Sequence, residues 1–102
     1  MRIENGKYSA GEFHERWNLA GSGFSRTRAF RDKINFAQPF DNPPKVMIAI
    51  SGFDISDVGE SFRSSIEVQA ERITTEGFTV QFNAYDTSRV RGLTVTWLAI
   101  GA

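Results

Sequence analysis

Apolar and polar residues alternate over short stretches of this chain, and this alternation restricts the fold more than any other feature. Side chains two positions apart share a face of a strand, so a period of two predicts strands that bury one side. Glycine, proline and asparagine interrupt the stretches at short intervals. The pattern predicts six strands, over residues 2–8, 28–36, 45–55, 65–73, 77–84 and 93–100. Short strands with close turn signals favour an antiparallel sandwich or barrel.

The apolar rows of five of these stretches supply a core. Trp97 lies within such a row, so we interpret it as a core residue. The rows are Phe30, Ile34 and Phe36; Val46, Ile48 and Ile50; Ile66, Val68 and Ala70; Phe78, Val80, Phe82 and Ala84; and Leu93, Val95, Trp97 and Ala99.

Two stretches are apolar on their second face as well. Residues 45–55 carry Met47 and Ala49 there, and residues 93–100 carry Leu98 and Ile100. One face of a strand in a two-layer sandwich normally meets water, so something is expected to cover this face. Either the long irregular segment 10–27 folds over it, or another subunit does.

Length and composition favour a single domain over residues 1–102, which is long enough to fold alone. Twelve basic residues balance twelve acidic ones, which argues against a dedicated nucleic-acid binder. The absence of cysteine excludes disulfides and thiolate metal sites. No secretory signal and no apolar run of bilayer length, about 20 residues, is present. We therefore expect no membrane insertion, synthesis in the cytoplasm, and either release or incorporation into a virion-like particle.

The long segment holds three large aromatic residues, which we expect to anchor it onto the sandwich: Phe13, Trp17 and Phe24. Trp17 has an alternative role as a platform for stacking a ligand. His14 is the only histidine, and we interpret it as a polar surface group because the sequence shows no acid–base partner for it.

An acidic segment places Asp54, Asp57 and Glu60 three residues apart. Such oxygen ligands suit calcium, but the spacing does not match an EF-hand loop. We interpret the segment as a solvated acidic loop, and we expect no cofactor or metal.

The connection between the last two strands, YDTSRVR, is unusually rich in functional groups for a hairpin. A sugar presents hydroxyls at fixed angles and an apolar C–H face. Carboxylates and the arginine fork bind hydroxyls, and a tyrosine ring covers the apolar face at low entropy cost. Asp86 and Arg91 are therefore candidate ligand-binding residues. The alternative is an exposed cross-strand ion pair between Asp86 and an arginine. For Arg89 we favour this ion pair over ligand binding. Alternation turns Ala84 inward and Tyr85 outward.

The segments INFAQPFDNPPKVMIAISGFD and GFTVQFNAYDTSRVRGLTVTWLAIG together resemble the H-type lectin domain family, of the snail agglutinin type. The resemblance lies in a Pro-Phe and a Pro-Pro, a strand ending in a bulky residue and Asp, a Gly-Phe strand, an aromatic edge and a final strand with Trp. It implies a six-stranded antiparallel β-sandwich that forms trimers or hexamers. It also implies metal-free sites at subunit edges for galactose or N-acetylgalactosamine.

The resemblance also implies which residues form the site. Gly23 matches a family glycine, Ser25 stands where the family has Asp, and Arg63 lies two residues from the family's arginine position, which is Ser65 here. The neighbouring subunit would contribute the last hairpin, where Tyr85 replaces a tryptophan and Arg91 stands at a tyrosine position. The implied carbohydrate-binding residues are Gly23, Ser25, Arg63, Tyr85, Asp86 and Arg91.

Two hypotheses of function follow. The first is a multivalent carbohydrate-binding module, and the second is a structural or receptor-binding component of a phage-like particle without retained sugar specificity. A glycosidase needs two facing carboxylates with separated pKa values, and the sequence offers no such arrangement, so we expect no enzymatic activity.

Overall fold

The computed structural model describes residues 1–19, 28–55, 65–85 and 90–102. It confirms the six-stranded antiparallel β-sandwich. Two three-stranded sheets have the orders β1-β6-β3 and β2-β5-β4, and every pairing is antiparallel. The strands are β1 (Arg2–Gly11), β2 (Arg28–Asn35), β3 (Lys45–Ile55), β4 (Ser65–Glu71), β5 (Gly77–Tyr85) and β6 (Val90–Gly101).

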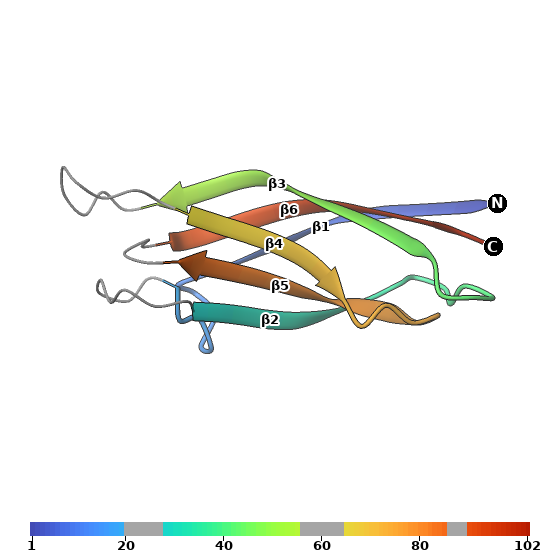
Figure 1. Ribbon diagram of the computed structural model, residues 1–102, viewed down its shortest axis with the longest axis horizontal. Coiled ribbons are helices and arrows are strands. Elements are labelled where there is room, and N and C mark those ends of the chain that lie inside the picture. Colours follow the sequence, from blue (N-terminus) through green and yellow to red (C-terminus); the bar gives the residue numbers. More distant parts are fainter. Residues whose placement is uncertain (20–27, 56–64, 86–89) are drawn as a thin grey trace.

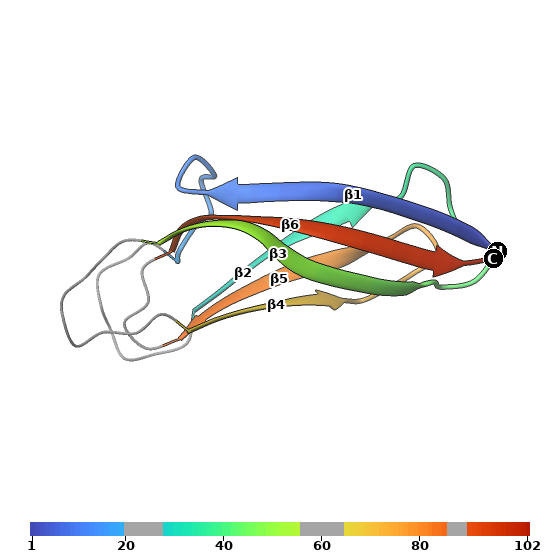
Figure 2. The ribbon, with the colours of Figure 1, turned by 90° about the horizontal axis from the view of Figure 1, so that it is seen from above.

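The strands run along the long axis of an elongated molecule (Figure 1). Its extents are 49 × 21 × 21 Å, and its radius of gyration of 14.9 Å exceeds the roughly 13 Å of a compact domain of this length. Both termini lie at one end, which we call the terminal end (Figure 2). At the opposite end, the loop end, β5 stops and β6 begins.

Pairing between strands moves several boundaries away from the predicted ones. The first strand was predicted to end at residue 8, but β1 continues to Gly11, because its last residues pair with the start of β6. That start lies at Val90, three residues before the predicted boundary. Strand β4 ends before the predicted limit, because Arg72 has a left-handed φ of 49° and leaves the sheet.

The space between the sheets is filled by rings in two groups. Near the loop end, Phe82 lies 6.0–6.1 Å, ring centre to ring centre, from Tyr8, Trp17 and Phe30. Near the terminal end, Trp97 packs on Phe36 and Phe78 at 5.9 and 5.4 Å. Trp97 is 6% exposed, which confirms its assignment to the core.

Segment 12–19 is attached to the sandwich by Trp17 and Leu19. The indole Nε1 of Trp17 donates to the carbonyl of Val90 at 2.8 Å, and Leu19 is fully buried. Trp17 is therefore an anchor, as predicted. The same prediction was wrong for Phe13, whose side chain is 78% exposed. Phe24 lies outside the described residues.

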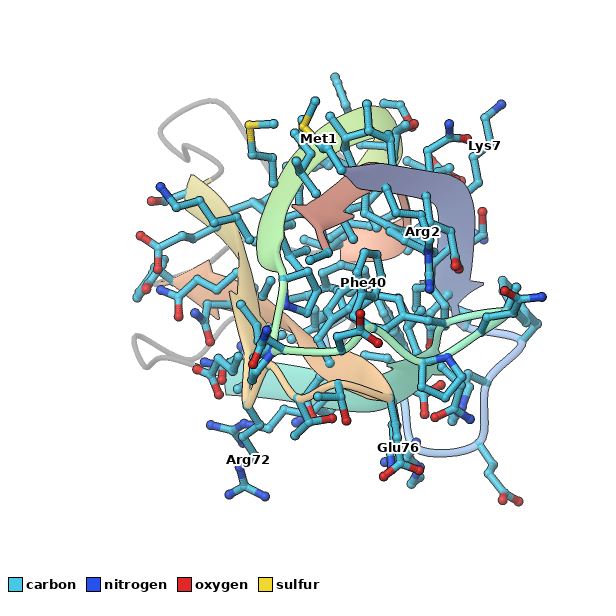
Figure 3. The ribbon with its side chains drawn as sticks, turned by 90° about the vertical axis from the view of Figure 1, so that its right-hand side faces the viewer. Met1, Arg2, Lys7, Phe40, Arg72 and Glu76 are labelled. Carbon is cyan, nitrogen blue, oxygen red and sulfur yellow. The ribbon has the colours of Figure 1, made fainter. Side chains whose placement is uncertain are left out.

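Arg2 closes the terminal end of the sandwich. Its guanidinium lies 3.8 Å from the centre of the Phe40 ring and donates to the carbonyl of Pro39 at 2.8 Å. Figure 3 shows Phe40 between the two layers with Arg2 above it. These contacts tie the start of β1 to the segment between β2 and β3.

The two strands that are apolar on both faces, β3 and β6, are neighbours in one sheet. Register places their outer apolar residues together with Ile3 of β1. We call this surface, which lies toward the terminal end, the apolar patch. The described part of segment 10–27 does not cover the patch, because Ile3 and Met47 remain 56% and 55% exposed. The members of the patch are Ile3, Met47, Leu98 and Ile100.

Candidate functional site

The described strand ends that flank the predicted site residues all lie at the loop end (Figure 1). Arg28 begins β2 opposite Ala84, and Ser65 begins β4 opposite Tyr85. Val90 begins β6 opposite Ile55. Most of the predicted site residues fall in three segments between strands. The strand ends on both sides of these segments lie together at one end of the fold.

Four predicted site residues lie outside the described residues: Gly23, Ser25, Arg63 and Asp86. The same applies to Arg89, Asp57 and Glu60. Their roles stay predictions. Tyr85 and Arg91 are described, and so is Asp54.

Tyr85 ends the central strand of its sheet and points outward, as the alternation predicted. Ala84 is fully buried while Tyr85 is partly exposed. The phenol donates to Oε1 of Glu67, on the adjacent strand β4, at 3.1 Å. Partial burial and this hydrogen bond raise the pKa of Tyr85, so the group stays a neutral donor at physiological pH. The contact fixes the direction of the ring at the edge of the loop end.

A ladder of polar side chains leads up to Tyr85 along the outer face of the β2-β5-β4 sheet. Arg31 Nε donates to Gln81 Oε1 at 2.9 Å, and Gln81 Nε2 donates to Asn83 Oδ1 at 2.9 Å. Glu67 Oε1 then accepts from Asn83 and from Tyr85. Although Gln81 and Asn83 are nearly buried, each is hydrogen-bonded, so the ladder can hold Tyr85 without an unsatisfied polar group.

Sequence reasoning missed this ladder, and in particular Glu67 as the partner of Tyr85. The outward positions of residues 65–73 and 77–84 carried the signal, because they alternate polar side chains with the apolar core row. Which of those polar groups meet depends on the register between β4 and β5, and the sequence pattern does not contain that register.

Arg91 belongs to the other sheet and makes a different contact. Its Nε donates to Oε1 of Glu12 at 2.7 Å, and this hydrogen bond raises the pKa of the guanidinium. Both side chains are about half exposed, so the pair adds little stability. Among residues 1–19, 28–55, 65–85 and 90–102, the structure therefore gives Arg91 and Tyr85 no common partner within one chain.

A second polar cluster joins β1 to β2 across the two sheets. Tyr8 donates its phenol proton to Asp32 Oδ2 at 2.5 Å, and Arg16 donates to Oδ1 at 3.3 Å. His14 also belongs here, with Nε2 3.8 Å from Asp32 Oδ2 and the ring edge-on to Phe30. The interpretation of His14 as a surface group without an acid–base partner was therefore wrong, because the fold brings Asp32 beside it.

Asp32 makes this cluster sensitive to acid. Burial acts to raise the pKa of Asp32, but the hydrogen bonds from Tyr8 and from the Lys33 amide, with the charge of Arg16, outweigh burial and lower it. A depressed carboxyl pKa stabilises the fold above the unfolded-state value of about 4. This stabilisation is lost as the pH falls through the lower, folded-state pKa.

We expect Tyr8→Phe to lower the free energy of unfolding by about 1–2 kcal/mol at pH 7, the value of a hydrogen bond to a charged acceptor that is partly exposed. The gap between the variant and the wild type should narrow as the pH falls below about 4 and through the depressed pKa of folded Asp32, where the carboxylate becomes protonated. Urea unfolding at pH 7 and pH 3 measures both values. An equal gap at the two pH values would contradict the role of the charge, and Asp32→Asn serves as the matched control.

Among the described residues, no group of three or more histidine, aspartate or glutamate side chains is arranged to hold a metal ion. The same described residues form no helix with the length and apolar character needed to span a membrane.

The chain belongs to the H-type lectin domain family, whose sequence pattern matches residues 31–100. This match confirms the resemblance that the sequence suggested. The match begins within β2, at Arg31, and ends within β6, at Ile100. It includes both Tyr85 and Glu67.

The fold is similar to that of discoidin II from Dictyostelium discoideum, in two solved structures. The native recombinant protein superposes with a TM-score of 0.78 over 96% of this chain, and the wild-type protein with 0.80 over 98%. Sequence identity is 26% in both. In each case the chain spans 36% of the discoidin II chain.

A curated relative, "ATP synthase subunits region ORF 7" of Fuscovulum blasticum, is 31% identical over 75 residues. The match covers 74% of this chain and 63% of the relative. The chain therefore spans less than two thirds of the length of each of these relatives.

Proposed function

We propose that this protein is a carbohydrate-binding module that acts in multiple copies, with a sugar site at the loop end between neighbouring subunits. The proposal rests on the position of the Tyr85 ring. Glu67 holds this ring at the loop end of the β2-β5-β4 sheet, in a chain of the H-type lectin domain family. Lectin domains bind rather than transform their ligands, so family membership supports a non-enzymatic role.

Tyr85 and Glu67 offer two kinds of contact that a sugar needs. The ring provides a flat surface for the apolar C–H face, and only two side-chain torsions have to be fixed. Oε1 of Glu67 already accepts from Tyr85, Asn83 and Gln69. Its second oxygen, Oε2, has no donor among the described residues and can accept from a sugar hydroxyl. Gly23, Ser25, Arg63, Asp86 and Arg91 complete the proposed site, part of it from the adjacent subunit. A galactose or N-acetylgalactosamine type of sugar is proposed from the family resemblance.

The apolar patch is the proposed subunit interface. It is an exposed apolar area on a sheet face, and such areas mark association surfaces when they are contiguous. The outer face of the other sheet carries the polar ladder instead, which favours contact with water. We propose a trimer, or a hexamer of paired trimers, because several copies convert weak single-site binding into avidity.

We expect Tyr85→Ala to reduce binding to a glycan array at least tenfold, because the variant removes both the stacking surface and the donor to Glu67. Tyr85→Phe keeps the ring and should retain most of the binding. Size-exclusion chromatography with light scattering checks that both variants keep the wild-type mass. Unchanged binding by Tyr85→Ala with an intact oligomer would place the sugar site away from Tyr85. Absence of glycan binding by the wild-type protein would instead favour the structural, phage-like role.

A further inference from the structure

A cleft of about 470 Å³ opens between the edge strands β3 and β4, near the loop end. Register turns Phe53 of β3 inward beside Leu93. Ile66 of β4 turns inward as well, because it pairs with the buried Ala84. Inward side chains are normally buried, yet Phe53 is 70% exposed and Ile50 is 38% exposed. We call this opening the side cleft, and its lining residues are Ile50, Ser51, Gly52, Phe53, Ile55 and Ile66.

The opposite side of the sandwich is closed by segment 12–19, which runs in pale blue from β1 toward β2, away from β3 and β4 (Figure 3). Trp17 and Leu19 pack on the core there, and Arg16 donates to Asp32 of β2. The described residues provide no such cover over the side cleft, as the exposure of Phe53 shows. One side of each chain is therefore covered and the other is open.

Segment 12–19 also carries a ring that its own chain leaves uncovered, because Phe13 is 78% exposed. This ring lies at the same level along the strands as the side cleft. Gly92 of β6 pairs with Gly11 of β1 on one side and with Asp54 of β3 on the other. Phe13 and Phe53 lie within two residues of these paired positions. An exposed ring and an apolar cleft thus lie at one level, at opposite edges of the same three-stranded sheet.

The two sides of the sandwich also carry opposite charge. Strand β2, which borders the closed side, has three basic residues and one acidic residue. Strand β4, which borders the side cleft, has two acidic residues and no basic one. Arg72 follows β4, but it lies toward the terminal end and away from the cleft (Figure 3). When two chains approach each other, these charges favour contact between unlike sides and oppose contact between like sides.

We propose that Phe13 of one subunit inserts into the side cleft of the next subunit, so that the chains join head to tail. The inference rests on the proposed association of several copies, and it names a contact that holds them together. Aromatic side chains seated in apolar pockets are typical anchors of protein interfaces. A benzene ring needs an apolar cavity of only about 150 Å³, so the side cleft has room for the Phe13 ring.

This contact joins two different surfaces, and such contacts repeat around a rotation axis until they close into a ring. Because Phe13 and the side cleft lie at one level, successive subunits need no shift along the axis, as a closed trimer requires. The loop ends of neighbouring subunits then lie side by side, where the proposed sugar site takes residues from both. A two-fold dimer would instead place each side against its own copy, and the ring and the cleft would stay unmatched.

The test is photo-crosslinking of the intact protein with p-benzoylphenylalanine in place of Phe13, which keeps an aromatic side chain at this position. Irradiation is expected to join chains into covalent dimers and trimers. Mass spectrometry of the peptides should place the attachment on residues 50–55 or on Ile66 of the other chain. Attachment to segment 12–19 of the other chain would indicate a two-fold contact and would overturn the proposal. Attachment within one chain only, or none in an assembled protein, would also overturn it.

Phe13→Ala measures what the ring contributes to assembly. Analytical ultracentrifugation should show that the protomer concentration at half-assembly rises by at least about tenfold, as for an interface anchor. Phe13→Leu keeps an apolar side chain and should raise this concentration clearly less. If Phe13→Ala leaves it unchanged while Met47→Lys dissociates the oligomer, the apolar patch alone holds the subunits and the inference fails.

None of these measurements involves a sugar, so they separate this inference from the proposed function. If the chains assemble and crosslink as expected but bind no glycan, the head-to-tail contact stands and the lectin role fails. If a glycan binds but the protein stays monomeric at every concentration tested, the contact proposed here fails and sugar binding stands.

Discussion

Phe82→Ala is expected to lower the free energy of unfolding by about 3–5 kcal/mol, the usual cost of removing a buried phenylalanine ring. Phe82 is fully buried, and its ring contacts the rings of Tyr8, Trp17 and Phe30. Deleting it leaves a cavity at the point where β1, β2 and segment 12–19 meet the central strand β5. The contacts are rigid aromatic ones, so the site cannot collapse easily to refill the space.

The measurement is thermal unfolding at one fixed protomer concentration, because association stabilises the folded state by mass action. For a domain of this size 1 kcal/mol corresponds to about 4–8 °C, so the midpoint should fall by at least about 12 °C. Phe82→Leu keeps most of the apolar volume and should cost clearly less. A fall below about 4 °C for Phe82→Ala would show that the ring is not a main source of stability. If that variant fails to fold, Phe82→Leu still gives the sign and order of the effect.

Met47→Lys is expected to convert the proposed oligomer into monomers and to reduce binding to a dense glycan surface by a factor of about 10²–10⁴. Met47 is 55% exposed in the single chain, so the lysine should leave the fold of the monomer intact. At a closed interface, however, each subunit would bury an unpaired ammonium group, which costs several kcal/mol. Because the proposed site takes residues from two neighbouring subunits, the affinity of a single site for a free sugar should fall as well.

Light scattering gives the mass, and surface binding on a glycan-coated sensor gives the avidity. Asn35→Lys introduces the same charge on the outer face of the other sheet, at an exposed position of β2, and should leave both values unchanged. An oligomer that survives Met47→Lys with its mass intact would place the interface elsewhere. If Met47→Lys lowers the mass of the oligomer but leaves surface binding unchanged, strong surface binding does not depend on association through the apolar patch.

Much of the fold follows from alternation alone. The predicted limits of β3 match the structure, and the inward row of β5 is buried throughout. Ile50 shows where this reasoning stops. It shares the inward face with Val46 and Ile48, as predicted, yet it is 38% exposed. The strand lies at the edge of its sheet and a register shift follows Ile50, and neither feature can be read from a local pattern.

The candidate site divides in the same way. Alternation turned Tyr85 outward because Ala84 points into the core, and the structure agrees. Glu67 could not be predicted as the partner of Tyr85, since it lies on another strand and meets Tyr85 only through the register between β4 and β5. The expectation that Phe13 anchors its segment failed for a related reason: Trp17 and Leu19 are the large side chains of that segment that pack on the core, and which of them do so depends on the path of the chain over the sandwich.

The sequence by itself determined which residues form strands and which side of each strand faces the core, because both follow from the two-residue period of a single chain segment. It also determined the family, through the ensemble of residues between positions 31 and 100. Only the tertiary structure decided that β3 and β6 share a sheet, that Glu67 holds Tyr85, and that Asp32 meets Tyr8 and His14. Those outcomes depend on strand order and register, which arise from long-range pairing and cannot be inferred from local alternation.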